Sequence, residues 1–67
     1  MISTPAGTLL PDSHYDITLT HDGHVHVFSN ALVRAFTSDG RSCYEFTADG
    51  VTMGFLPEHV SALALKL

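Results

Sequence analysis

Hydrophobic and polar residues alternate along most of this chain, and alternation with a period of two is typical of β-strands. In the segment 14–20 the apolar residues Tyr15, Ile17 and Leu19 occupy every second position, with polar residues between them. Because successive side chains of a strand point to opposite faces of a sheet, this segment predicts a strand with one buried face. Similar alternation recurs at 24–28, 31–37, 42–47 and 51–55.

Three Asp-Gly pairs separate these segments: Asp22-Gly23, Asp39-Gly40 and Asp49-Gly50. Asp-Gly between alternating segments is the strongest short-range signal of a β-hairpin, because Gly adopts a positive φ angle without steric cost. The chain is therefore expected to reverse direction three times and to form an antiparallel meander.

The register of the first hairpin depends on how many residues its turn holds. A two-residue loop at Asp22-Gly23 would pair Leu19 with His26 and mix apolar with polar faces. A three-residue loop over 21–23 would pair Leu19 with Val25 and keep the apolar face whole. We therefore expect the three-residue loop, with a bulged turn.

The second hairpin contains a long strand that is interrupted by Ser29-Asn30, where alternation fails. We interpret this break as a bulge or bend, which is how small barrels turn a corner. A two-residue turn at Asp39-Gly40 would then set Arg34 opposite Glu45. The alternation does not decide which face of the segment 31–37 is buried, because either set of alternate residues could form the buried face.

The last hairpin and the C-terminal segment follow the same logic. A two-residue turn at Asp49-Gly50 would pair Phe46 with Met53 and Tyr44 with Phe55. At 57–60, a proline followed by a glutamate predicts a 3₁₀ or short helical turn. The segment 62–67 fits a strand by its alternation. It fits a helix by its alanines and by the i, i+3, i+7 spacing of Val60, Leu63 and Leu67; we favour a fifth strand.

Together these elements predict a mainly β fold, a five-strand antiparallel meander curled into a small SH3-like or Sm-like barrel over residues 14–67. Residues 1–13 are rich in Ser, Thr, Pro and Gly and predict a flexible or extended lead-in. Thr8-Leu9-Leu10 within it fits a short edge strand. A chain of 67 residues is one domain, near the lower limit of what a single core stabilises.

Net charge and hydrophobic content limit the classes of partner that this chain is expected to bind. The net charge is −4, and the only Lys and Arg residues are Arg34, Arg41 and Lys66. Because nucleic-acid binding relies on cations that neutralise phosphates, this composition argues against it and suits a basic protein partner better. A hydrophobic content of 45% favours a homo-oligomer.

A single cysteine, Cys43, fits a reducing compartment. The chain has neither a signal peptide pattern nor an apolar run of roughly 20 residues, so we expect a cytoplasmic protein without a membrane segment.

The chain contains five histidines in 67 residues, a high frequency, and these side chains are its main candidates for metal binding. His24 and His26 share one face of their strand and can supply two ligands to zinc or copper, with His21 or Asp16 as a third. The competing interpretation is that these histidines are solvent-exposed residues of a strand face. No cofactor and no catalytic residue is predicted, because no nucleophile has a base and an oxyanion site at a recognised spacing.

The order of strands, with a bent second strand and a 3₁₀ turn before the last one, resembles small SH3-like and Sm-like barrels. The closing segment Gly54-Phe55-Leu56-Pro57-Glu58-His59-Val60-Ser61-Ala62-Leu63 looks like the 3₁₀ turn and last strand of those folds. It is similar in rhythm to the Lys-His-Ala-Ile-Ser stretch of the bacterial Sm-like RNA chaperone: His59 and Ser61 match its His and Ser, and Glu58 stands in place of its lysine. The run 17–23 is similar to the opening hairpin of the Rho-binding antiterminators, acidic proteins that block the terminator Rho. This resemblance implies an oligomeric nucleic-acid-binding protein or an inhibitor of another protein.

We therefore expect a small non-enzymatic regulatory or interaction module that binds another protein through a sheet face or edge. The alternatives are an Sm-like oligomer that binds nucleic acid and a histidine-based metal-binding protein. The predicted partner-binding residues are His24, His26, Phe28, Arg34, Phe36 and His59.

Overall fold

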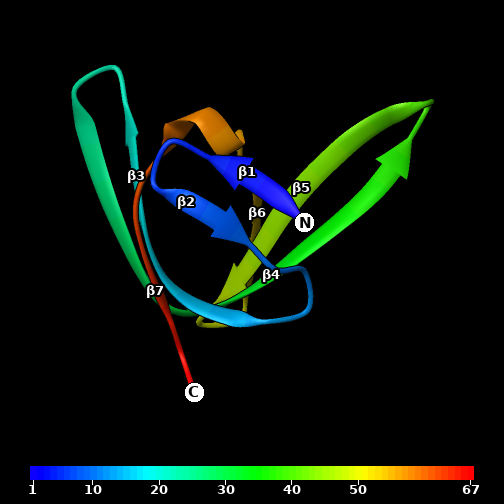
Figure 1. The fold of residues 1–67 in the computed structure, drawn as a ribbon. Coiled ribbons are helices and arrows are strands. Elements are labelled where there is room, and N and C mark those ends of the chain that lie inside the picture. Colours follow the sequence, from blue (N-terminus) through cyan, green and yellow to red (C-terminus); the bar gives the residue numbers. More distant parts are fainter.

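The computed structural model describes all 67 residues and is built almost entirely of β-strands (Figure 1). The elements are β1 (Ile2–Thr4), β2 (Gly7–Leu9), β3 (His14–His21), β4 (His24–Ser38), β5 (Arg41–Ala48), β6 (Val51–Gly54), the 3₁₀ helix η1 (Pro57–His59) and β7 (Val60–Leu65). It contains no helix with the length and hydrophobicity needed to cross a bilayer.

The last five strands form one antiparallel sheet in the order β6-β5-β4-β3-β7. Strands β3 to β6 follow one another as neighbours, which confirms the predicted meander, and β7 returns to pair with β3. Strands β6 and β7 lie at the two edges of this sheet. The strand pairing thus gives an open five-stranded sheet, and closure into a barrel is not confirmed.

All three Asp-Gly turns contain two residues with positive φ angles. In the first turn Asp22 has φ 50° and Gly23 has φ 76°, the conformation of a type I′ turn, whose twist matches that of the flanking strands. Strand pairing sets Leu19 opposite His26, so the expected three-residue loop is wrong. Local turn chemistry prevails here because the hairpin end buries little: Val25 and Val27 are 62% and 67% exposed.

The predicted bend in the long strand is a β-bulge. Pairing shifts between Tyr15 opposite Ala31 and Ile17 opposite Phe28, and Asn30 has φ 54°. The Asn30 N–H donates a hydrogen bond to Asp16 Oδ1 at 3.0 Å. The bulge inserts one extra residue, so the odd-numbered residues after it face the same side as Phe28.

This bulge decides the face of 31–37 that the alternation left open. Ala31 and Val33 are buried, and Val33 lies opposite Phe46. Arg34 faces outward opposite Glu45, as expected, with 3.1 Å between Nη1 and Oε1. Phe46 also pairs with Met53, which confirms the predicted last hairpin.

The core is a single apolar cluster inside the curved sheet. Its buried residues are Ile2, Leu9, Tyr15, Ile17, Ala31, Val33, Phe46, Ala48, Phe55 and Val60. Two of them come from the first nine residues of the chain.

The segment that we expected to be a flexible or extended lead-in forms the β1–β2 hairpin, which lies across the curved sheet (Figure 1). The Leu10 N–H donates to the Tyr15 hydroxyl at 3.1 Å, and the Asp12 N–H donates to the Val33 carbonyl at 2.8 Å. The hairpin thus contributes Ile2 and Leu9 to the core and is fastened to β3 and β4.

The C-terminal segment agrees with the favoured interpretation. Pro57 begins the 3₁₀ helix, and the Val60 N–H donates a hydrogen bond to the Pro57 carbonyl. Strand β7 follows directly, with Leu63 opposite Ile17. The return of β7 to the first strand of the meander places η1 beside the end of the β3–β4 hairpin.

Candidate functional site

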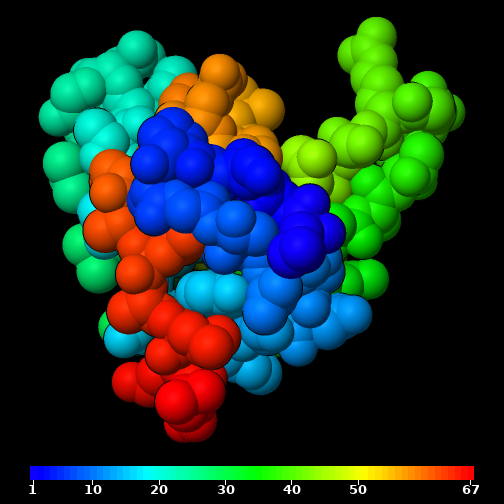
Figure 2. Space-filling view, in the orientation of Figure 1, coloured from blue at the N-terminus to red at the C-terminus, as the bar shows by residue number.

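The outer half of the β4–β5 hairpin projects from the body of the protein and leaves a notch beside η1 (Figure 2). Strand β6 accompanies β5 only as far as Gly54, which pairs with Glu45. Strand β5 itself begins at Arg41. The segment of β5 before Glu45 therefore has β4 on one side and a largely open edge on the other.

The hydrogen-bond pattern shows which groups of this edge are available. Residues that flank a two-residue turn bond to each other, and bonded and non-bonded pairs then alternate. Arg41 and Cys43 therefore bond to β4, whereas Ser42 and Tyr44 direct their backbone groups away from it. The Tyr44 carbonyl accepts the Phe55 N–H at 3.0 Å. Ser42, one step further out, is exposed and has no strand beside it.

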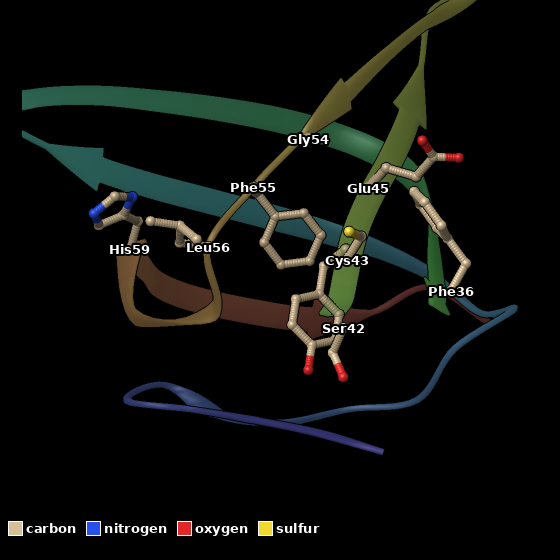
Figure 3. A pocket seen from close by; sticks show the side chains of 9 residues that line it. Phe36, Ser42, Cys43, Glu45, Gly54, Phe55, Leu56 and His59 are labelled. Atoms are coloured by element: carbon tan, nitrogen blue, oxygen red, sulfur yellow. The ribbon is translucent and has the colours of Figure 1, made fainter. Parts of the chain in front are cut away.

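An apolar groove of about 490 Å³ lies along this open edge (Figure 3). It is lined by Phe36, Ser42, Cys43, Tyr44, Glu45, Gly54, Phe55, Leu56 and His59. Phe55 is buried, whereas Phe36 and Leu56 are 43% and 51% exposed. The volume is within the usual range of ligand sites, and exposed aromatic and aliphatic side chains are typical of protein contacts.

A second hollow of about 260 Å³ lies under the inner face of the same hairpin, next to the N-terminus. Phe36, Ser42 and Tyr44 line both hollows. The open edge at Ser42 is thus placed between two recesses. A strand added at such an edge would direct its alternate side chains to opposite faces.

The charged groups of the groove are few. Glu45 is the only carboxylate in the lining, and Arg34 contacts it from β4. This ion pair is partly exposed, so its contribution to stability is small. Neither arginine nor lysine lines the groove, and His59 is its one histidine.

His59 also belongs to a second cluster, at the end of the β3–β4 hairpin. Its Nε2 atom is 3.1 Å from His21 Nδ1, and the ring centroids are 4.2 Å apart. The other ring nitrogen of His21, Nε2, is 3.2 Å from Asp22 Oδ2. Next to this pair, the hydroxyls of Thr20 and Ser61 are hydrogen-bonded at 2.9 Å.

A row of aromatic rings crosses the inner face of the sheet towards the groove. Centroid distances are 6.4 Å from His26 to Phe28, 4.6 Å from Phe28 to Phe46, 5.8 Å from Phe46 to Phe55 and 6.1 Å from Phe55 to Tyr44. Phe28 is therefore half-buried against the core.

The structure brings two of the predicted partner-binding residues, Phe36 and His59, into one groove. Arg34 lies beside it through Glu45, whereas His24, His26 and Phe28 belong to the other hairpin and do not line it.

The sequence interpretation missed Ser42, Tyr44, Phe55 and Leu56 as site residues. The available signal was the short strand that ends at Gly54, before the proline that starts η1. A short β6 implies an incompletely covered β5.

The predicted metal ligands His24 and His26 do not meet a third ligand. No three His, Cys, Asp or Glu side chains converge as a metal site in this structure. A metal at His24 and His26 therefore stays a prediction from the sequence.

Comparison of the chain with models of known protein families, with curated proteins and with solved structures gives no significant match. The groove, the open edge and the histidine cluster are therefore the features of this chain from which its function is inferred.

Proposed function

We propose that this protein is a small non-enzymatic interaction module that binds an extended segment of a protein partner along the open edge of β5. The observation that carries the proposal is the position of Ser42, whose outward backbone groups lie at an uncovered edge between two recesses. Edge strands with free N–H and C=O groups readily accept another strand.

The mode of binding is strand addition. Backbone hydrogen bonds to Ser42 would supply affinity, and the recesses would select alternate side chains. Phe36 and Leu56 offer exposed apolar surface on the groove side. The partner segment should therefore be extended, with apolar residues at every second position.

Charge favours a basic segment. The chain carries −4 net charge, and the groove contains Glu45 but no lysine or arginine. Complementary charge accelerates encounter and suppresses wrong partners more than it adds affinity. Lysines at the ends of the partner segment would be attracted by this negative charge without entering the apolar recess.

The type of sheet and the regulatory role of the module are a second part of this proposal. We propose that the curved sheet is of the SH3-like or Sm-like barrel type and that the module is regulatory, for example an inhibitor. The bulged β4, the 3₁₀ turn and the return of β7 to β3 support this type. The engagement of Arg34 by Glu45 gives no support to the alternative of nucleic-acid binding.

The test uses capped eight-residue peptides with alternating apolar residues and terminal lysines, added to ¹⁵N-labelled protein. We expect NMR shift changes centred on Ser42, Tyr44 and Leu56. A Ser42→Pro variant removes the outward N–H of the edge and should weaken binding on the order of tenfold, since one net hydrogen bond is worth about 1 kcal/mol.

Thr52→Pro is the matched control, because Thr52 lines neither recess and its N–H points to the free outer edge of β6, away from its partner Thr47. This variant should bind the peptides like the wild type. Equal loss in both variants, or shift changes that avoid the groove, would contradict the proposal. Binding of single-stranded RNA in place of the peptides would favour the nucleic-acid alternative.

A further inference from the structure

We infer that His21, His59 and His24 form a binding site for a divalent transition-metal ion at the end of the β3–β4 hairpin. The central observation is the separation of 3.1 Å between His21 Nδ1 and His59 Nε2. Two imidazole nitrogens bound to one zinc ion at about 2.0–2.1 Å lie roughly 2.9 Å apart at right angles and roughly 3.3 Å apart in a tetrahedron. The two nitrogens are thus already at the separation of ligands to one metal. The rings, whose centroids are 4.2 Å apart, would tilt apart to direct both lone pairs to the ion, which would replace the proton between them.

Asp22 prepares His21 for this role. Its Oδ2 atom is 3.2 Å from His21 Nε2, the ring nitrogen that faces away from His59. A carboxylate in this position accepts the Nε2–H and leaves the lone pair on Nδ1, the arrangement that orients many metal-binding histidines. The tautomer of His21 that Asp22 favours is therefore the one a metal requires.

The third ligand follows from the register of the hairpin. The two-residue turn places His24 directly opposite His21, and the side chains of directly opposed residues share a face of the sheet. His24 does not converge on the pair in this structure, since no group of three ligands is formed. Its side chain is exposed, and exposed side chains change rotamer within nanoseconds.

The local charges favour a cation. Asp22 and Glu58 adjoin the two histidines in sequence, and no lysine or arginine belongs to β3, η1 or the turn between β3 and β4. Arg34 is engaged by Glu45, and Lys66 lies 3.7 Å from Asp16. Imidazole ligands suit Zn²⁺, Ni²⁺ or Cu²⁺ rather than Mg²⁺ or Ca²⁺, which prefer oxygen.

Solvent exposure of the cluster leaves coordination positions for water, so this is an exchangeable site rather than a closed structural one. A bound ion would join the β3–β4 hairpin to η1. Because His59 also lines the groove, metal binding would fix one wall of the proposed peptide site. The metal site itself does not depend on the proposed function.

The test is calorimetric titration of the whole protein with ZnCl₂ and with NiCl₂ at pH 7.5. We expect saturable binding of one ion per chain, abolished in His21→Ala and in His59→Ala and weakened in His24→Ala. His14→Ala is the control, because His14 lies at the opposite end of β3. It should bind like the wild type. Circular dichroism verifies that each variant is folded.

Asp22→Asn provides a second, sharper variant. Asn is as suitable as Asp at this turn position, so the hairpin is retained while the carboxylate is lost. We expect metal affinity to fall on the order of 10-fold.

Three outcomes would overturn the inference: no saturable binding to the wild type, equal loss of binding in His14→Ala, or NMR shift changes at His14 instead of His21 and His59. Full affinity in His24→Ala would overturn the assignment of the third ligand.

Discussion

Single residues fix the reversals of this chain. At each Asp-Gly turn the aspartate and the glycine both have positive φ angles, between 50° and 76°. Residues that carry a side chain rarely adopt such φ angles. A left-handed backbone conformation costs roughly 1–2 kcal/mol for residues other than glycine, and Asn and Asp tolerate it best. The sequence places at these positions the two residue types that minimise the cost.

A glycine substitution tests this account. Gly50 has φ 76° and open space around its Cβ position, so Gly50→Ala should lower the free energy of unfolding by roughly 1 kcal/mol through backbone strain alone. Urea denaturation followed by circular dichroism measures the change.

Gly54 is the matched control for that substitution. A Cβ atom there would meet the Tyr44 carbonyl oxygen at 3.7 Å, an ordinary contact, and its φ angle is not in the left-handed region. Gly54→Ala should therefore change stability less than Gly50→Ala. The opposite order would show that the turn conformation does not limit stability.

Among the elements, the β3–β4 hairpin shows which features the local sequence predicts and which it does not. Its strands, the position of its reversal and its bulge follow from local residues and were predicted, whereas the expected length of its turn was wrong. Its register was not predicted correctly, because apolar matching favoured Leu19 opposite Val25 whereas the turn sets Leu19 opposite His26. Apolar matching determines register only where both faces are strongly distinguished by burial, and this end of the hairpin is mostly exposed.

Two substitutions distinguish the registers. In the structure Ile17 is buried and Val27 is 67% exposed. We expect Ile17→Val to destabilise by about 0.5–1.5 kcal/mol. Val27→Ala, at an exposed site, should stay within about 0.5 kcal/mol of the wild type. Under the three-residue loop Val27 would be opposite Ile17 in the core, and Val27→Ala would then be the more damaging change in thermal or urea unfolding.

For the whole molecule, the decisive feature is that the first nine residues complete the core. A chain of 67 residues has a small core, here of ten buried residues. Burial of Ile2 and Leu9 is therefore a large share of its stability, and the β1–β2 hairpin is part of the folded domain. The composition of 1–13 concealed this, because its two core residues stand among turn-forming ones.

Leu9→Ala tests the contribution of this hairpin. Leu9 is fully buried, and Leu→Ala at buried sites costs about 2–5 kcal/mol. Such a loss would leave this small domain marginally folded, seen as a lower midpoint in urea denaturation.

The neighbouring Leu10 is exposed and provides the control. Leu10→Ala should be close to neutral. Similar midpoints for the two variants would indicate that residues 1–13 are not packed on the sheet in solution.

The sequence by itself determined strands β3 to β6, the three reversals, the bulge and the 3₁₀ turn, because each depends on residues within a few positions of one another. Only the tertiary structure decided how the elements meet. The pairing of β7 with β3, the cover by β1 and β2 and the open edge at Ser42 depend on distant segments. His21 and His59, 38 positions apart, meet only because β7 returns to β3. Local conformational preferences are encoded in neighbouring residues, whereas such encounters are set by the packing of the whole core.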